Sequence, residues 1–224
     1  MKRTPIRSRA LPPYTKAEEG INAASHIFGA AAAVAALVLC VVRAVNESDA
    51  WGIVSGAIYG SMMVLLYTVS GVYHALPRCT GKKVMQVLDH CSIYLMIGGT
   101  YTPILLTAVR TASPGWAWSL FGVVWGACAI STVFTAIDLK KYEKLSMLCY
   151  ILIGWCIVLS GKNILKALTP RGIVWLAAGG VVYTIGAVLY RAGKKRRYMH
   201  CVFHIFVLLG SACHFVCIYE YVLC

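Results

Sequence analysis

Charged side chains are scarce in this sequence of 224 residues, and the shortage decides its broad class. Asp, Glu, Lys and Arg together make up 13% of the chain, whereas 59% of the residues are hydrophobic. Soluble globular domains carry about a quarter charged residues. A chain with so few charges cannot cover itself with a polar surface in water. The composition excludes a disordered protein, a secreted disulfide scaffold and a soluble nucleic-acid-binding protein, and it predicts an integral membrane protein.

The motifs of several common sites are also missing. The ten cysteines lie mostly in apolar stretches and none form a CxxC pair, so we expect neither a disulfide framework nor a cysteine-rich metal site. No GxGxxG or P-loop motif occurs in the context of a strand followed by a helix, which excludes the usual nucleotide-binding loops.

Long apolar stretches are what the sequence has instead. A membrane-spanning helix needs about 20 mostly apolar residues. Residues 1–21 form a basic and polar N-terminal segment without the apolar core of a signal peptide, and residues 22–224 form one transmembrane domain. Within the third stretch, Tyr101-Thr102-Pro103 predicts a helix kink with local hydroxyl bonding. We expect an all-α bundle of seven transmembrane helices over residues 22–42, 52–75, 87–109, 115–137, 144–161, 172–190 and 199–222.

Basic residues are distributed unevenly between the two sides of this predicted bundle. Of the 21 Lys and Arg residues, sixteen lie in the N-terminal segment and in the second, fourth and sixth loops, and five lie on the other side. Such a bias places the richer side in the cytoplasm. The sequence predicts a multi-pass protein of the inner (plasma) membrane, with a cytoplasmic N-terminus and an extracytoplasmic C-terminus.

Ionisable residues within apolar helices are candidates for function, because they are expensive to bury in lipid. His214 lies about 15 Å beyond His204 along the last helix, so we expect it to pack against its neighbours and not to share a site with His204. The other histidines and one carboxylate all lie at predicted cytoplasmic helix ends: His26, His74, Asp89, His90, His200 and His204.

The pair His200 and His204 suits a metal ion. Residues four apart project from one face of a helix, and two imidazoles at that spacing can bind one zinc ion. His74 can supply a third nitrogen, and three protein ligands with an open fourth position are typical of catalytic zinc. Ser70 lies one turn from His74, and Asp89 can act as a base or orient an imidazole. A proton relay or interhelical hydrogen bonds would explain the same residues without a metal.

Several motifs at these positions resemble the hemolysin III family, the prokaryotic-type relatives of the progestin and adipoQ receptors. The resemblance covers nearly the whole chain after residue 17, and the ordered set SxxxH, Asp and HxxxH is specific. The segments that carry it are residues 22–29, 70–74, 88–93, 99–103, 154–155, 179–184, 200–204 and 214–215.

The resemblance implies a seven-helix bundle with zinc near the cytoplasmic face. It implies His74, His200 and His204 as ligands, Asp89 holding a water in the coordination sphere, and Ser70 nearby. It also implies membership of a wider group of proposed membrane metal hydrolases, whose adiponectin-receptor branch acts as a ceramidase, and a link to membrane fluidity homeostasis. The chain lacks the long N-terminal domain of the receptor relatives, so we expect no protein hormone as partner.

Our interpretation is a zinc-dependent hydrolase of a lipid amide or ester that serves membrane lipid balance, with membrane lipids as its partners. Zinc would polarise the scissile carbonyl, Asp89 would take the proton of the attacking water, and Ser70 would bond the water or the developing oxyanion. The alternatives are a membrane-permeabilising hemolysin and a receptor-like sensor without catalysis. A channel needs polar residues along its whole length, whereas the outer halves of these helices are nearly all apolar.

Overall fold

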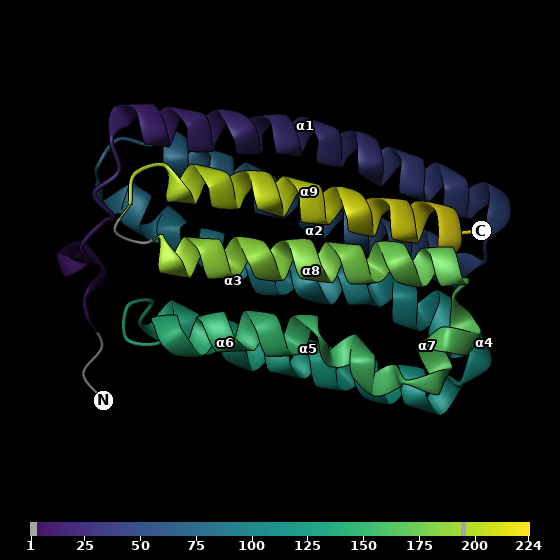
Figure 1. Ribbon diagram of the computed structural model, residues 1–224. Helices are drawn as coiled ribbons and strands as arrows, with labels where there is room; N and C mark the ends of the chain where they lie inside the picture. Colours follow the sequence, from purple (N-terminus) through teal and green to yellow (C-terminus); the bar gives the residue numbers. More distant parts are fainter. Residues whose placement is uncertain (1–3, 194–195) are drawn as a thin grey trace.

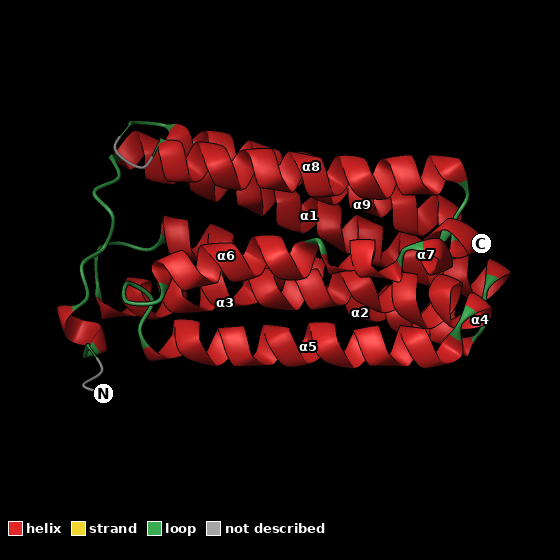
Figure 2. Ribbon diagram, turned by 60° about the horizontal axis from the view of Figure 1, so that its bottom comes forward, coloured by secondary structure: helices red, strands yellow, loops and turns green. Residues whose placement is uncertain are grey.

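The computed structural model describes residues 4–193 and 196–224, and within these ranges every regular element is a helix (Figures 1 and 2). Seven helical segments of the described residues are long and apolar enough to cross a membrane, which confirms the predicted number. The elements are η1 (Ile6–Ser8), α1 (Lys16–Glu47), α2 (Ala50–Ala75), α3 (Thr80–Pro103), η2 (Ile104–Val109), α4 (Arg110–Ala112), α5 (Pro114–Ile137), α6 (Glu143–Gly154), η3 (Cys156–Ser160), α7 (Lys162–Ala167), α8 (Pro170–Ala192) and α9 (Met199–Tyr221).

The long helices run side by side, and the first described residues lie at the opposite end of the bundle from the C-terminus (Figure 1). An odd number of crossings requires this arrangement. We refer to the two ends of the bundle as the N-terminal end and the C-terminal end. Four residues of the charge count, Lys2, Arg3, Lys194 and Lys195, lie outside the described residues.

Two helices begin earlier than the hydropathy pattern predicts. Helix α1 begins at Lys16 and not near residue 22, because Thr15 and Glu18 form a reciprocal capping box at its first turn. Helix α3 begins at Thr80, so that Lys82, which the charge count places in a loop, is helical and buried. The hydropathy pattern detects the apolar part of a helix that lies in lipid, and it does not detect polar turns at the end of that helix.

The third membrane segment departs from α-helical geometry where the kink is predicted. After Pro103 the chain continues as the π-helix η2. The Tyr101 hydroxyl receives a hydrogen bond of 2.7 Å from the N–H of Ile157 and lies 3.0 and 2.9 Å from the carbonyl oxygens of Ile153 and Gly154. Tyr101 therefore satisfies backbone groups where α6 ends and η3 begins.

Small residues bring neighbouring helices close together. A Cβ atom at Gly60 of α2 would lie 2.6 Å from the Cα of Leu37 in α1, closer than atoms can pack. A Cβ atom at Gly186 of α8 would likewise lie 2.7 Å from the Cβ of Phe206 in α9. Close approach of this kind stabilises helix packing in lipid, where apolar side chains gain little by leaving the solvent.

The chain before α1 crosses the N-terminal end of the bundle and is tied to the end of α5 and to the loop between α2 and α3. Residues 4–15 precede the helix (Figure 1). The Arg9 guanidinium donates to the carbonyl oxygen of Ile137 at 2.7 Å, and the Arg78 guanidinium donates to that of Pro12 at 2.7 Å. The segment therefore lies over the end of the bundle where the histidines gather.

Candidate metal centre

Three imidazoles meet at the N-terminal end of the bundle. His74 closes α2, and His200 and His204 lie on consecutive turns of α9. The Nε2 atom of His200 lies 3.2 Å from that of His74 and 3.1 Å from that of His204. These residues are the group of described side chains that could hold a metal ion, each offering an atom within 4.8 Å of the others. The structure thus brings together the three residues that the spacing and the resemblance singled out.

A carboxylate fixes the ring of His74. The Nδ1 atom of His74 lies 2.6 Å from Oε2 of Glu19, so Nδ1 carries the proton and Nε2 offers its lone pair to the cluster. The other oxygen of Glu19 lies 2.8 Å from Nζ of Lys82, which also donates to the carbonyl oxygens of His74 and Leu76. A carboxylate behind a histidine ligand is the usual second partner in metal sites.

Sequence reasoning missed Glu19 and Lys82. Glu19 precedes His26 by seven residues, which is two turns on one helix face. Its charge lies next to the first apolar residues of α1, and a charge in that position needs a partner. The charge of Lys82 at the start of α3 is the matching signal. The sequence does not show that both side chains surround His74.

The ring of His204 is also oriented by its neighbours. Its Nδ1 atom lies 3.3 Å from Oγ of Ser25. The Ser25 hydroxyl donates its own proton to the carbonyl oxygen of Asn22 at 3.0 Å, so the hydroxyl acts as acceptor and Nδ1 of His204 as donor. The Nε2 atom of His204 is therefore unprotonated and, like Nε2 of His74, directs a lone pair at the cluster. The ring of His26 stacks on that of His204, with centroids 3.7 Å apart.

Aromatic rings cover the cluster from the N-terminal side. The ring of Tyr14, in the segment before α1, stacks on His200 with centroids 4.9 Å apart and planes 18° apart. The Tyr190 ring lies 5.4 Å from the same imidazole. Burial raises the pKa of the Tyr14 hydroxyl well above its ordinary value, so the hydroxyl stays protonated and brings no negative charge to the cluster.

A cavity of about 190 Å³ extends from the cluster into the bundle. Ser70 and Asp89 line it together with His200 and His204, so both proposed catalytic residues face the same space. Asp89 lies outside the three-nitrogen group, and its Oδ2 atom is 3.6 Å from Nδ1 of His90. That neighbour is itself anchored, since Nδ1 of His90 lies 2.8 Å from the carbonyl oxygen of Gln86. The role of Asp89 as base stays a prediction.

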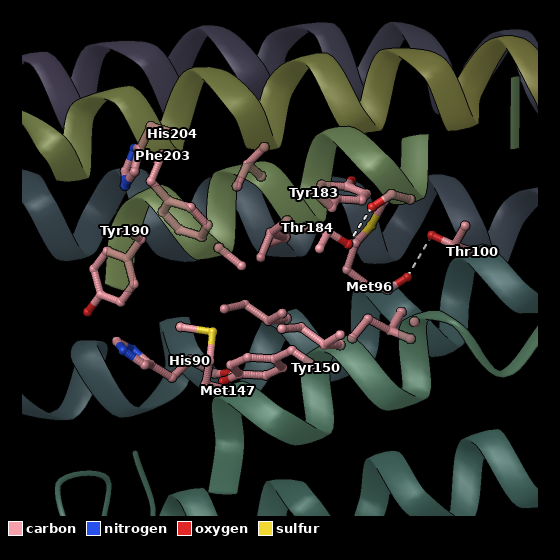
Figure 3. Close-up of a pocket in the computed structure, with 18 of the residues that line it drawn as sticks. His90, Met96, Thr100, Met147, Tyr150, Tyr183, Thr184, Tyr190, Phe203 and His204 are labelled. Atoms are coloured by element: carbon pink, nitrogen blue, oxygen red, sulfur yellow. Dashed lines mark hydrogen bonds between the residues drawn. The ribbon is translucent and has the colours of Figure 1, made fainter. Parts of the chain in front are cut away.

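The walls of this cavity are mostly apolar, and they come mainly from α3, α6, α8 and α9, with residues of α1 and α2 at the side. Figure 3 shows His90, Tyr190 and His204 at one end, and Thr100, Tyr183 and Thr184 toward the other. A second hollow of about 520 Å³, between the segment before α1 and the helix ends, also reaches His90, Tyr190 and His200. The cluster thus lies between an apolar cavity and a more polar hollow.

His214 lies apart from the cluster, as predicted. Its Nε2 atom is 3.2 Å from the carbonyl oxygen of Leu176 in α8, and its ring packs over Gly179. The prediction of a packing role is incomplete, however, because His214 also lines the cavity at a level well removed from His204.

Comparisons with known proteins identify the family of the chain. A model of the family described as haemolysin-III related matches residues 14–215. The chain is 36% identical to "Hemolysin-3" of Bacillus cereus over 92% of each protein, and 34% identical to the "Hemolysin-3 homolog" of Bacillus subtilis (strain 168) over 93% of this chain and 96% of that protein. It is also 25% identical to the human "Monocyte to macrophage differentiation factor" over 98% of this chain and 90% of that protein. The chain is a multi-pass integral membrane protein that belongs to the haemolysin-III related family.

Proposed function

We propose that this protein is a zinc-dependent hydrolase that cleaves the amide or ester bond of a membrane lipid. The observation that supports the proposal most directly is the convergence of three imidazole Nε2 atoms at one end of an apolar cavity. An apolar cavity with a few convergent polar groups is the usual form of a small-molecule site. Here the polar groups are those that zinc prefers, and the cavity suits an acyl chain.

The donor set fits zinc. Nitrogens about 2.0–2.1 Å from one ion, at tetrahedral angles, lie roughly 3.3–3.4 Å apart, and the two closest pairs in the cluster are 3.1 and 3.2 Å apart. The Nε2 atoms of His74 and His204 both present lone pairs, and an N–H at Nε2 of His200 could donate a hydrogen bond to only one of them. A cation placed among the three satisfies all of them at once.

Each side chain then has a defined task. When bound, zinc would polarise a lipid carbonyl and lower the pKa of water at an open fourth position. Asp89 would hold the attacking water and take its proton. Ser70 would donate a hydrogen bond to the oxygen on which negative charge develops. His74 and His204 are held in register by Glu19 and Ser25, so little reorganisation is needed as the reaction proceeds.

The two hollows suit the two parts of an acylated lipid. The acyl chain would occupy the apolar cavity, and the polar part would lie in the hollow beneath residues 4–14, where Arg9, Lys140 and Arg196 contribute positive charge. The excess of Lys and Arg around this end supports a cytoplasmic orientation. The reaction would then release a fatty acid into the bundle and its polar partner toward the cytoplasm.

Metal analysis joined to lipid product analysis tests the proposal. Purified protein should hold about one zinc ion per chain, and His200→Ala should lose it. Asp89→Asn should keep most of the zinc while release of fatty acid from a panel of N-acyl and O-acyl lipids falls by about 10²–10⁴. Glu220→Gln, at an exposed position in the last turns of α9, is the matched control and should change neither. Full zinc content in His200→Ala, or full activity in Asp89→Asn, would refute the assignment.

Membrane permeabilisation is the second candidate, because two relatives carry the name hemolysin. The apolar middle of the cavity, lined by Ile93, Met96 and Val207, is unsuited to conduct ions or water. Dye release from vesicles that contain the purified protein distinguishes the two functions. Release without lipid products would favour permeabilisation, and bound zinc with neither activity would favour a sensor.

A further inference from the structure

The cavity has a second polar region, about three turns of α9 away from the metal cluster. His214 of α9, Tyr183 and Thr184 of α8, and Trp155 between α6 and η3 all line the cavity there. Polar groups at this depth face lipid-like surroundings, so each needs a partner inside the protein. Their hydrogen bonds show which of them are free to bind something else.

The hydroxyl groups of this region are already engaged. Oγ of Ser211 lies 2.6 Å from the Tyr67 hydroxyl and 2.7 Å from the Tyr183 hydroxyl. Oγ1 of Thr184 accepts from the indole N–H of Trp155 at 3.0 Å and donates to the carbonyl oxygen of Gly180 at 2.7 Å. These groups bind one another across the helices and hold the walls of the cavity in place.

The imidazole of His214 is the exception. Its Nε2 atom faces the carbonyl oxygen of Leu176, which can only accept, so Nε2 carries the proton and Nδ1 is a bare acceptor. That Nδ1 atom is buried and has no hydrogen-bond partner among the described residues. The residue as a whole is 9% exposed.

The packing of the ring shows which edge carries the free acceptor. A Cβ at Gly179 would overlap the Cδ2–Nε2 edge of the ring, so this edge lies against the backbone of α8. The Nδ1 atom is on the opposite edge, turned away from Gly179, in a residue that lines the cavity. A buried acceptor without a donor is unfavourable, and a hydrogen-bond donor in the cavity would satisfy it.

We propose that Nδ1 of His214 binds a hydroxyl group carried on the acyl chain of the lipid that occupies this cavity. The inference rests on the proposed function, in which the carbonyl of that chain lies at the histidine cluster. His214 is ten residues from His204, or about 15 Å along the helix. A C–C bond of about 1.5 Å advances an extended chain by roughly 1.3 Å, so the hydroxyl would lie about twelve carbons from the carbonyl.

A pair of simple acids tests the proposal. Dodecanoate and 12-hydroxydodecanoate would compete against radiolabelled dodecanoate for zinc-loaded protein in detergent, because a carboxylate can take the place of the lipid carbonyl at the metal. The measured quantity is the affinity for 12-hydroxydodecanoate divided by the affinity for dodecanoate. We expect this ratio to be about threefold to tenfold higher in the wild-type protein than in His214→Phe, which has a ring but no acceptor. Comparing ratios between proteins cancels the different partition of the two acids into micelles.

Two controls make the measurement specific. His214→Asn places an acceptor oxygen near the position of Nδ1 and should restore the preference, whereas a general packing defect would not be rescued. The shorter pair octanoate and 8-hydroxyoctanoate should show no His214-dependent preference, because the hydroxyl would fall short of the ring. The thermal stability of each variant, measured alongside, identifies any that fail to fold.

The outcomes separate this inference from the proposed function. Equal ratios in the wild-type protein and His214→Phe would overturn the inference. A second outcome is a His214-dependent preference for the hydroxylated acid together with unchanged binding of dodecanoate to His200→Ala. This outcome would support the hydroxyl site and refute the binding of the carbonyl at the metal. If dodecanoate does not bind the zinc-loaded protein, the proposed function and the inference fall together.

Discussion

Glu19 should set the affinity of the candidate metal centre although it is not expected to bind the ion. Its carboxylate lies 2.6 Å from Nδ1 of His74 and makes that imidazole a stronger ligand by stabilising positive charge on it. Glu19→Gln keeps the size of the side chain but removes the charge. A hydrogen bond to a charged group contributes about 1.5–3 kcal/mol, and about 1.4 kcal/mol corresponds to a factor of ten. We expect the zinc dissociation constant to rise about tenfold to a hundredfold.

The partner of Glu19 has to be controlled in the same experiment. Lys82, whose side chain is 3% exposed, pairs with the other oxygen of the carboxylate at 2.8 Å, and Glu19→Gln would leave this ammonium without its counter-charge. A buried charge without its partner destabilises a fold. Lys82→Met and the double variant Glu19→Gln/Lys82→Met separate the two effects. The loss of zinc affinity should follow Glu19 in both backgrounds, whereas the loss of thermal stability should be largest in Glu19→Gln alone.

Zinc affinity would be measured by competition with a chromogenic chelator of known affinity, and folding by thermal unfolding of the purified protein. Glu47→Gln, at the exposed end of the same helix, is the control and should bind zinc like the wild type. If Glu19→Gln/Lys82→Met is folded and binds zinc with unchanged affinity, the carboxylate does not support His74 as a ligand. The reasoning from the 2.6 Å contact would then be wrong.

Three further predictions concern other parts of the bundle. Tyr101→Phe should lower the free energy of unfolding by about 1–3 kcal/mol in chemical denaturation, because backbone groups at the α6–η3 junction lose their partner; an unchanged value would contradict this. A topology reporter inserted beside Arg78 should report a cytoplasmic location and one fused after Cys224 an extracytoplasmic one; the reverse result would invert the bundle. Hydrogen bonds from Thr4 hold the pKa of Asp138 below its ordinary value, so the stability they provide is present above that value and is lost as the pH falls through the lowered pKa. Proteolysis of the N-terminal segment should therefore accelerate only below about pH 4, and a constant rate there would refute the link.

The parts of this structure that follow from local sequence were predictable. Seven apolar stretches give seven crossings, since the length of a spanning helix is set by the thickness of the membrane. The pair His200 and His204 is set by the pitch of one helix. The addition of His74 needed only the orientation rule, which places the end of the second helix and the start of the last at the same level.

Features that depend on how distant segments meet were not predictable in this way. Glu19 and Lys82 lie in different helices, and only packing shows that both reach His74. The stacking of Tyr14 on His200 joins residues that are far apart in the chain. The hydropathy pattern assigns each residue to lipid or water, but it does not predict which polar side chains contact one another.

The irregular backbone of the bundle begins close to residues that line the cavity, and this location has a physical reason. The π-helix η2 begins three residues after the cavity-lining residue Tyr101, and the interruption between α6 and η3 falls at Gly154 and Trp155, which line the same cavity. Non-helical backbone at membrane depth is tolerated only where it is buried in protein or faces a cavity, because its polar groups need partners. Tyr101 supplies those partners from one helix to the other. The interruption between α6 and η3 is therefore tolerated at this depth because Tyr101 satisfies its free backbone groups.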